Sequence, residues 1–159
     1  MRRKDRQVTE LSEIKKILDK CKVFRLGINQ DNTAPYVVPL NYGYEFQDEK
    51  LVIYFHCSTI GKKLDLIQKN PYVGIEMNGD GELEEGKAAC SYSYKFSSIM
   101  GSGKAEILEN QEEKIKAFEI IMKHQTGKDF TDFRDKPSIV DKVGIVRIEV
   151  DEYTGKQHI

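Results

Sequence analysis

The chain has 159 residues, enough for one domain with a core of its own. Hydrophobic residues make up 39% and charged residues 32%, which is typical of a soluble globular protein rather than a disordered or membrane-embedded one. The formal net charge is −1, so the chain lacks the basic excess that usually accompanies nucleic-acid binding. We therefore expect no nucleic-acid partner.

The sequence also gives no sign of a membrane or a secretory route. No apolar stretch approaches the roughly 18 residues that span a bilayer. The charged start, MRRKDR, does not match a signal peptide; it could be a basic arm, although such starts are more often solvated termini. Cys21, Cys57 and Cys90 form an odd set without CxxC spacing, which favours reduced thiols and a cytoplasmic protein.

The first half of the chain is predicted to contain a helix and three strands. Thr9 suits an N-cap, and the face formed by Leu11, Ile14, Ile17 and Leu18 is apolar. Pro39 cannot donate a ladder hydrogen bond, so it marks an edge strand or a bulge. The predicted elements are a helix over 9–20, strands over 22–28 and 35–46, and a third strand over 50–56 joined to the second as a hairpin.

The second half alternates strands with two helices. A helix over 59–69 is stopped by Pro71. A later helix is capped by Asn110 and ended by Gly127, with Ile115, Phe118, Ile121 and Met122 on its inward face. The remaining predictions are a strand over 72–77, an exposed loop over 78–87, a β segment over 90–108 with a bend at its glycines, a loop over 128–138 and a strand over 143–150.

This order of elements does not form a series of βαβ units. Hairpin-like spacing instead favours an antiparallel sheet that closes into a small barrel with helices packed outside it. We find no internal repeat and no linker, so residues 1–159 are expected to form a single domain of the all-β or α+β class.

Lysines at the start of the 59–69 helix pose an electrostatic question. Lys62 and Lys63 fall in the first turn after a predicted N-cap at Ser58 or Thr59, where the helix dipole is already positive. Positive side chains at this end of a helix are unfavourable, because the dipole repels them. A bound anion such as phosphate would turn this repulsion into attraction, and Gly61 would let the anion approach the backbone. Alternatively, the two lysines extend into water near Asp65.

Other candidate motifs fail on their spacing. GSGKA (101–105) is not a phosphate-binding P-loop, because Ser98 and Ala105 stand where that motif needs Gly and Ser or Thr. His56 and Cys57 are adjacent on a strand and so point to opposite faces, which disfavours a catalytic dyad. His124, in the last turn of its helix, is most simply a partner of the helix dipole. No spacing supports a metal site.

Four segments together resemble the FMN-binding split-barrel superfamily of pyridoxamine 5'-phosphate oxidase-like proteins, and in particular its nitroimidazole-resistance-like branch. They are PYVVPLNYGY (35–44), YFHCSTIGKKLDLIQKNP (54–71), FSSIMGSGKAE (96–106) and YTGK (153–156). The resemblance implies a six-stranded antiparallel split β-barrel with flanking helices. It also implies a homodimer with FMN sites at the subunit interface.

The resemblance further implies roles for individual residues. Lys62 and Lys63, after Gly61, would hold the FMN phosphate with help from Ser58 or Thr59. The backbone of Val38, Pro39 and Leu40 would run along the isoalloxazine ring. The side chain of Asn41, His56 at its strand end, and Ser98 would be further candidates for cofactor contact, with His56 as a candidate catalytic group.

Two departures from the family limit what carries over. Phe96 stands where the family has tyrosine, which removes a hydroxyl. The chain also lacks the arginine-rich clamp that pyridoxamine-phosphate oxidases use for their substrate, so vitamin B6 oxidation is not expected.

Three functions follow from the resemblance. The first is an oxidoreductase that passes electrons from a reduced nicotinamide to a small organic acceptor, such as a nitroimidazole-like compound, with the flavin carrying the chemistry. The second is a non-catalytic flavin carrier or redox sensor. The third is a relative that binds haem in the same interface.

Overall fold

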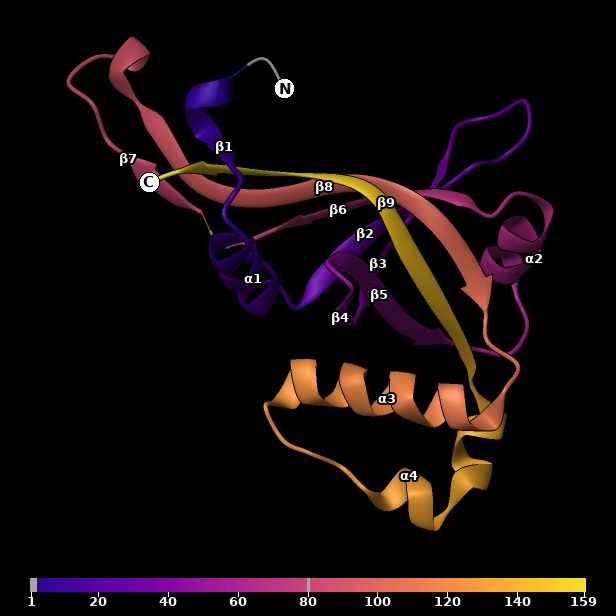
Figure 1. Cartoon of the computed structure of the whole chain (residues 1–159). Coiled ribbons are helices and arrows are strands. Elements are labelled where there is room, and N and C mark those ends of the chain that lie inside the picture. The colour runs from indigo at the N-terminus through magenta and orange to yellow at the C-terminus, as the bar shows by residue number, and fades with distance from the viewer. Residues whose placement is uncertain (1–2, 80) are drawn as a thin grey trace.

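The computed structural model describes residues 3–79 and 81–159, which form nine strands, four α-helices and three short 3-10 helices (Figure 1). The strands are β1 (Gln7–Val8), β2 (Val23–Ile28), β3 (Tyr36–Asn41), β4 (Gly43–Gln47), β5 (Lys50–Cys57), β6 (Tyr72–Asn78), β7 (Glu82–Glu84), β8 (Ser93–Ile107) and β9 (Gly144–His158). The α-helices are α1 (Leu11–Lys20), α2 (Lys62–Lys69), α3 (Gln111–Thr126) and α4 (Asp132–Asp135). The 3-10 helices span Lys4–Arg6, Ala89–Ser91 and Pro137–Lys142.

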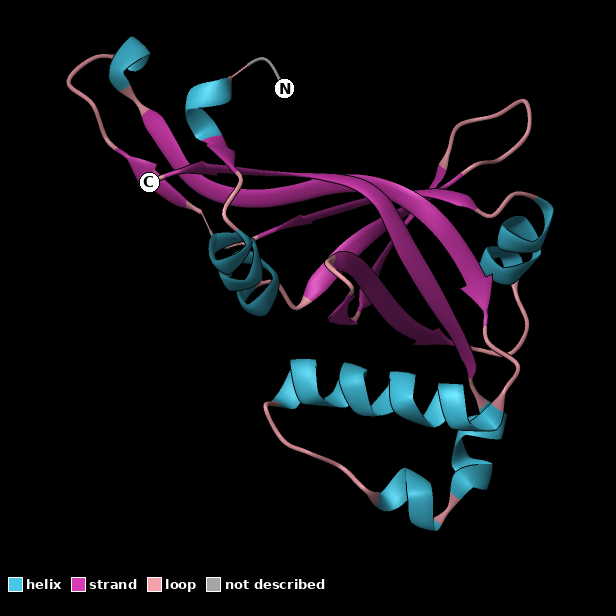
Figure 2. Ribbon diagram, viewed as in Figure 1, coloured by secondary structure: helices cyan, strands magenta, loops and turns pink. Residues whose placement is uncertain are grey.

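Seven strands follow one another in an antiparallel sheet of order β3-β2-β6-β8-β9-β5-β4, while β1 pairs with β9 and β7 with β8. β8 and β9 pair from Phe96 opposite His158 to Ile107 opposite Val146, with a bulge after Ser102. A bulge bends its strand, and Figure 2 shows the β8–β9 pair curving across the molecule. The predicted bend near the glycines of β8 is therefore confirmed.

The curled antiparallel sheet forms a half-barrel, which is consistent with a split barrel. β3 lies close to β5, but no ladder joins these two strands within the part of the chain that the structure describes. The antiparallel barrel with flanking helices agrees with the prediction. The expected count of six strands does not, because seven strands lie on the main path of the sheet.

The barrel interior is apolar and receives side chains from both small helices. Every second residue of the sheet points inward, as Leu26, Ile53 and Ile99 do with no exposed surface. α1 and α2 lie at opposite ends of the barrel in Figure 1, and both contribute to the same core cluster. The buried helix residues are Ile14, Ile17 and Leu18 from α1 and Leu64 and Ile67 from α2. Leu11, expected on the apolar face of α1, is instead 39% exposed.

α3 covers the outer face of β4 and β5. Asn110 caps it by accepting a hydrogen bond from the Glu113 N–H at 3.1 Å, and Gly127 ends it in the left-handed conformation, both as predicted. Gly43 on β4 permits this packing, because a Cβ there would lie only 2.6 Å from the Cα of Ile121. α3 is thus held directly on the backbone of the sheet.

The predicted strand over 35–46 is two strands rather than one. Tyr42, which separates β3 from β4, has no exposed surface and donates its hydroxyl to the Leu18 carbonyl at 2.9 Å. β3 is the terminal strand of the sheet, so Pro39 lies on an edge strand, as its missing N–H requires. The β4–β5 hairpin is confirmed, and both turn residues, Asp48 and Glu49, have positive φ.

The structure differs from the predicted elements at several other, mostly polar, segments. The 143–150 strand continues to His158, since β8 supplies hydrogen-bond partners along its whole length. A short strand, β7, forms within the predicted 78–87 loop, and α4 forms within the predicted 128–138 loop. α1 begins at Leu11 after Glu10, which corrects the predicted N-cap at Thr9.

The described part of the basic start is folded rather than frayed. Residues 4–6 form a 3-10 turn, and β1 pairs with the end of β9. Residues 1 and 2 lie outside the described part. Among the described helices, none is both long and apolar enough to cross a membrane.

Candidate functional site

The turn before α2 has a backbone conformation that favours glycine. Gly61 is the residue before the helix, with φ +138° and ψ 168°, and no atom lies within 4 Å of the position where a Cβ would stand. Ser58 forms a local turn instead, its hydroxyl oxygen accepting from the Ile60 N–H at 3.5 Å. The predicted N-cap at Ser58 or Thr59 is therefore replaced by Gly61, and the helix starts three residues later than expected.

This shift places the two lysines at the very start of the helix. Lys62 and Lys63 are its first and second residues, where the backbone N–H groups have no acceptor within the helix. No ion pair with a carboxylate is formed by either lysine in the described part of the chain, the nearby Asp65 included. Two ammonium groups therefore add to the positive end of the helix dipole without a counter-charge.

A small cavity of about 80 Å³ lies directly against these lysines. It has room for a group about the size of two or three waters, at roughly 30 Å³ each. Its walls come from both sides of the barrel seam, with Tyr36 at the start of β3 and Cys57 at the end of β5. Ser58, Ile60, Gly61, Lys62, Lys63 and Leu64 complete the lining.

Two of these wall residues, Tyr36 and Cys57, interact with the lysines, and the sequence analysis assigned neither of them to the phosphate site. The Lys62 ammonium lies 4.6 Å from the centroid of the Tyr36 ring. Burial raises the pKa of the Cys57 thiol, and the positive charge of Lys63 opposes that rise. Tyr36 is distant in sequence from the helix turn, so no sequence spacing could have indicated its contact with Lys62. Cys57 ends the strand just before the turn, but the sequence does not show that its side chain faces Lys63.

The β3 candidates lie along the same edge strand but point in different directions. Val38 and Leu40 pack against the barrel interior, whereas Pro39 is exposed. The Asn41 amide is already engaged, because it donates to the Lys22 carbonyl at 3.0 Å and to Oε1 of Gln125 at 3.1 Å. The strand could therefore offer a ligand its free backbone edge near Val38, while Asn41 is held at the other end.

His56 and Ser98 do not lie with the lysine cluster. The exposed His56 faces α3, with its ring centroid 5.4 Å from that of Phe118, on the opposite side of β5 from Cys57. Ser98 lies opposite Asn78 at the end of β6 remote from α2. At about 3.3 Å per residue, the length of β6 separates Ser98 from that helix by roughly 20 Å. Neither residue lines the cavity beside Lys62, so a cofactor role for either remains a prediction.

A larger cavity lies elsewhere. A groove of about 1000 Å³ runs between α1, β4 and α3. Its charged groups are mostly paired with one another: Lys123 with Asp129 at 2.8 Å, Lys116 with Glu45 at 3.1 Å and Arg134 with Glu119 at 2.8 Å. Because these charges already have partners, its size alone does not make this groove the candidate site.

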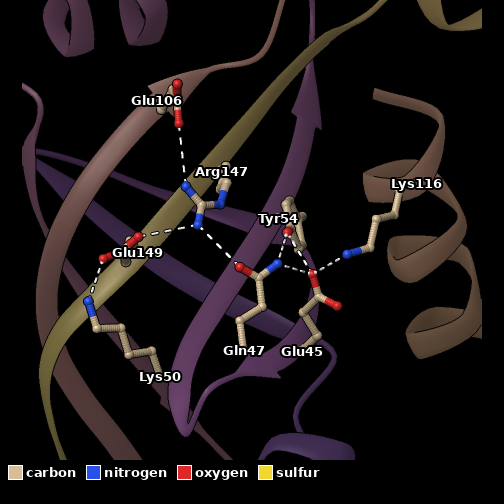
Figure 3. Close-up of polar contacts among 8 residues, drawn as sticks. All are labelled: Glu45, Gln47, Lys50, Tyr54, Glu106, Lys116, Arg147 and Glu149. Carbon is tan, nitrogen blue, oxygen red and sulfur yellow. Dashed lines mark hydrogen bonds and ion pairs between the residues drawn. The ribbon is translucent and has the colours of Figure 1, made fainter. Parts of the chain in front are cut away.

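A second charged cluster lies between the sheet and α3 and is drawn in Figure 3. Glu45 Oε1 accepts from the Tyr54 hydroxyl at 2.8 Å, from Gln47 Nε2 at 2.6 Å and from Lys116 at 3.1 Å. Arg147 continues the cluster by donating to Gln47 Oε1 at 3.3 Å. It also pairs with Glu106 and Glu149, and Lys50 pairs with Glu149. We call these eight residues the α3 network.

Burial and pairing shift the pKa values in the α3 network in opposite directions. Burial and, to a smaller extent, the hydrogen bond to Glu45 together raise the pKa of Tyr54 to about 12. Burial would also raise the pKa of Glu45, but donation from Tyr54, Gln47 and Lys116 outweighs it and lowers that pKa overall. A protonated phenol and an ionised carboxylate form a satisfied structural pair rather than a reactive one.

His124 is half-buried beside aromatic rings rather than acting as a charged partner of the helix dipole. Its ring centroid lies 4.6 Å from that of Tyr42, and its Nε2 donates to the Cys21 carbonyl at 2.9 Å. Burial lowers its pKa. Lys22 takes the predicted role by donating to the His124 carbonyl at 2.7 Å. Across residues 3–79 and 81–159, no group of three His, Cys, Asp or Glu side chains is arranged to hold a metal ion.

A family model and a solved structure both relate this chain to the same protein family. The family model described as pyridoxamine 5'-phosphate oxidase matches residues 10–157. A crystal structure of a candidate 5-nitroimidazole antibiotic resistance protein from Bacteroides thetaiotaomicron has 33% sequence identity and a TM-score of 0.80, covering 95% of this chain and 86% of that one. No protein of curated function matches significantly.

More distant structures share the fold. The flavocytochrome Anf3 of Azotobacter vinelandii has a TM-score of 0.77 at 14% identity, covering 100% of this chain and 72% of that one. An FAD-binding protein from Mesorhizobium loti has a TM-score of 0.64 at 23% identity, covering 97% and 98%. Together with the match over residues 10–157, the 33% identity shows that the chain belongs to the pyridoxamine 5'-phosphate oxidase-like family, in its nitroimidazole-resistance-like branch.

Proposed function

We propose that this protein binds FMN, with the phosphate held at the start of α2, and acts as an oxidoreductase. The observation that carries the proposal is the pair of uncompensated ammonium groups, Lys62 and Lys63, on the first two residues of a helix. Free N–H groups, the helix dipole and two cations converge there, and this combination suits a phosphate dianion. Family membership and the FAD-binding protein among its structural relatives support a flavin cofactor.

The residues at the turn fit a phosphate group. Gly61 leaves open space where any other residue would carry a Cβ. The 80 Å³ cavity is large enough for a phosphate but too small for a flavin ring. The flavin ring must therefore lie outside this cavity. β3 pairs with β2 on one edge only, so its other backbone edge, from Val38 to Leu40, is available to the ring.

Bound flavin would supply hydride and electron transfer, and the chain would supply position and electrostatics. We propose a reduced nicotinamide as electron donor and a small organic compound, such as a nitroimidazole, as acceptor. The similarity to the candidate resistance protein supports that acceptor class. Among the residues that line the lysine cavity, no carboxylate or imidazole is present to act as a general acid.

We further propose that the protein is a cytoplasmic homodimer. The outer face of β2, β3, β6 and β8 carries exposed apolar side chains, with Val37 59% and Met100 46% exposed. Exposed apolar patches of this kind mark interaction surfaces. A second copy on this face would cover a flavin ring beside β3, since planar ligands are mostly buried when bound.

The function is tested with the purified full-length protein. We expect FMN to restore an absorbance band near 450 nm in the apoprotein and NADH or NADPH to bleach it in stopped-flow experiments. A nitroimidazole added afterwards should bring the band back. Flavin binding without reduction by either nicotinamide would identify a carrier or sensor instead, and haem bands without flavin binding would contradict the proposal.

A further inference from the structure

Tyr36 connects the two halves of the proposed FMN site. It is the first residue of β3, whose backbone edge we assign to the flavin ring, and its own ring lies beneath the ammonium of Lys62 at 4.6 Å. Tyr36 is half-buried, packs against the barrel core and is fixed by its pairing with Ile28 of β2. A rigid ring therefore lies under the end of a flexible lysine.

The type of contact matters for anion binding. A carboxylate would also hold the Lys62 ammonium, but it would neutralise the charge and compete with a phosphate for it. An aromatic face attracts the cation through its quadrupole while leaving its positive charge available. It also restricts a long side chain whose ordering would otherwise cost entropy at the moment of binding.

The two lysines are positioned in different ways. Lys63 is partly buried, close enough to the Cys57 sulfur to oppose the burial-induced rise in that thiol's pKa. Lys62 is exposed and has only the Tyr36 ring beside it among the contacts of the described residues. Lys62 is therefore the lysine whose position depends on a single neighbour.

We infer that Tyr36 is a positioning residue for phosphate binding, acting through Lys62, so that discrimination between FMN and unphosphorylated riboflavin depends on an aromatic ring at this position. The inference rests on the proposed FMN site and adds a residue to it. Riboflavin has no phosphate for Lys62 to hold. Losing the Tyr36 ring should therefore weaken the binding of FMN but not that of riboflavin.

The test compares FMN and riboflavin affinities of the full-length apoprotein by quenching of flavin fluorescence. In Tyr36→Leu we expect the FMN preference to fall about two- to fivefold, the range of an exposed cation–π contact. Tyr36→Phe should keep the wild-type preference, because the ring face remains. Tyr36→Met fills the same space without a ring and should behave as Tyr36→Leu, which provides a second variant if the leucine protein does not fold.

A double-mutant cycle shows whether Tyr36 acts through Lys62. In a Lys62→Met background, Tyr36→Leu should cause no further loss of FMN preference. Phe46→Leu is the matched control, since it removes a ring that lies 5.3 Å from the ammonium of Lys15, remote from α2. It should leave the preference unchanged.

The outcomes separate this inference from the proposed function. A wild-type protein that binds FMN and riboflavin equally would overturn the phosphate site itself. A wild-type protein that prefers FMN, with Tyr36→Leu weakening both ligands by the same factor, would overturn only the positioning role and leave Tyr36 as a structural wall.

Discussion

The turn at the start of α2 and the α3 network both concentrate charged side chains, but the charges are paired in the α3 network and unpaired by carboxylates at the described α2 turn. In the α3 network, Arg147, Lys50 and Lys116 all have carboxylate partners, and the buried Tyr54 donates to Glu45. At the α2 turn, Lys62 and Lys63 form no such pair with any residue that the structure describes. Charge that is satisfied within the fold stabilises it, whereas charge left unsatisfied at a helix start lowers stability and is available to a ligand.

This contrast leads to opposite expectations for similar substitutions. Changes at the α2 turn should alter binding with little loss of stability. Changes in the α3 network should alter stability with little effect on binding.

The largest effect is expected for Lys62→Glu combined with Lys63→Glu. Hydrogen bonds to charged groups contribute about 1.5–3 kcal/mol each, so FMN affinity should fall at least about 100-fold in a fluorescence titration. The apoprotein should become more stable by about 1 kcal/mol, since acidic residues suit the positive end of a helix. Lys69→Glu, in the last turn of the same helix, is the control and should leave FMN affinity unchanged. Unchanged FMN affinity in the double variant would place the phosphate elsewhere.

The next effect is expected for Arg147→Met. This substitution removes the group that pairs with Gln47, Glu106 and Glu149. We expect a loss of about 1–2 kcal/mol in the free energy of unfolding, measured with urea, because the partners lose their donor. FMN affinity should stay within about twofold of wild type. A large drop in affinity with unchanged stability would reverse the roles we assign to the two regions.

Tyr54→Phe should have a smaller effect. It removes only the hydroxyl that donates to Glu45 and leaves Gln47 and Lys116 in place as donors. We expect a loss of about 1 kcal/mol or less in the free energy of unfolding. Urea denaturation at neutral pH measures it, and a gain in stability would show that the buried hydroxyl is not a net stabilising contact.

The smallest effect concerns pH. The pKa of Glu45 is lowered in the folded protein, so its contribution to stability is present above the unfolded pKa of about 4.3 and is lost as the pH falls through the folded value. The stability difference between wild type and Glu45→Gln should therefore shrink as the pH is lowered below about 4.3. A difference that stays constant over that range would mean that the carboxylate is not preferentially ionised in the folded state.

The sequence predicted the parts of this molecule that depend on local chemistry. Asn110 and Gly127 mark the ends of α3 because capping and left-handed backbone favour those residues. Lys62 and Lys63 stood out because their charge conflicts with the helix dipole. Hairpin-like spacing predicted an antiparallel barrel, and the family resemblance specified a split barrel. Gly61 was identified as a point of close approach, although not as the residue before the helix.

The remaining features arise from tertiary contacts. The polar end of β9 is a strand because β8 pairs with it, and nothing in its composition requires that. Tyr36 reaches Lys62 only because the barrel brings β3 and β5 together at the seam. His56, at the end of the strand that leads to the lysines, turns toward α3. A strand alternates its side chains, but the sequence does not say which face α3 covers.

The central claim is tested most directly by measuring the affinity of the wild-type apoprotein for FMN and for riboflavin under identical conditions. Two charge-assisted contacts to the phosphate should make FMN bind at least about 100-fold more tightly. Equal affinities for the two flavins would contradict the account, because the phosphate would then contribute nothing.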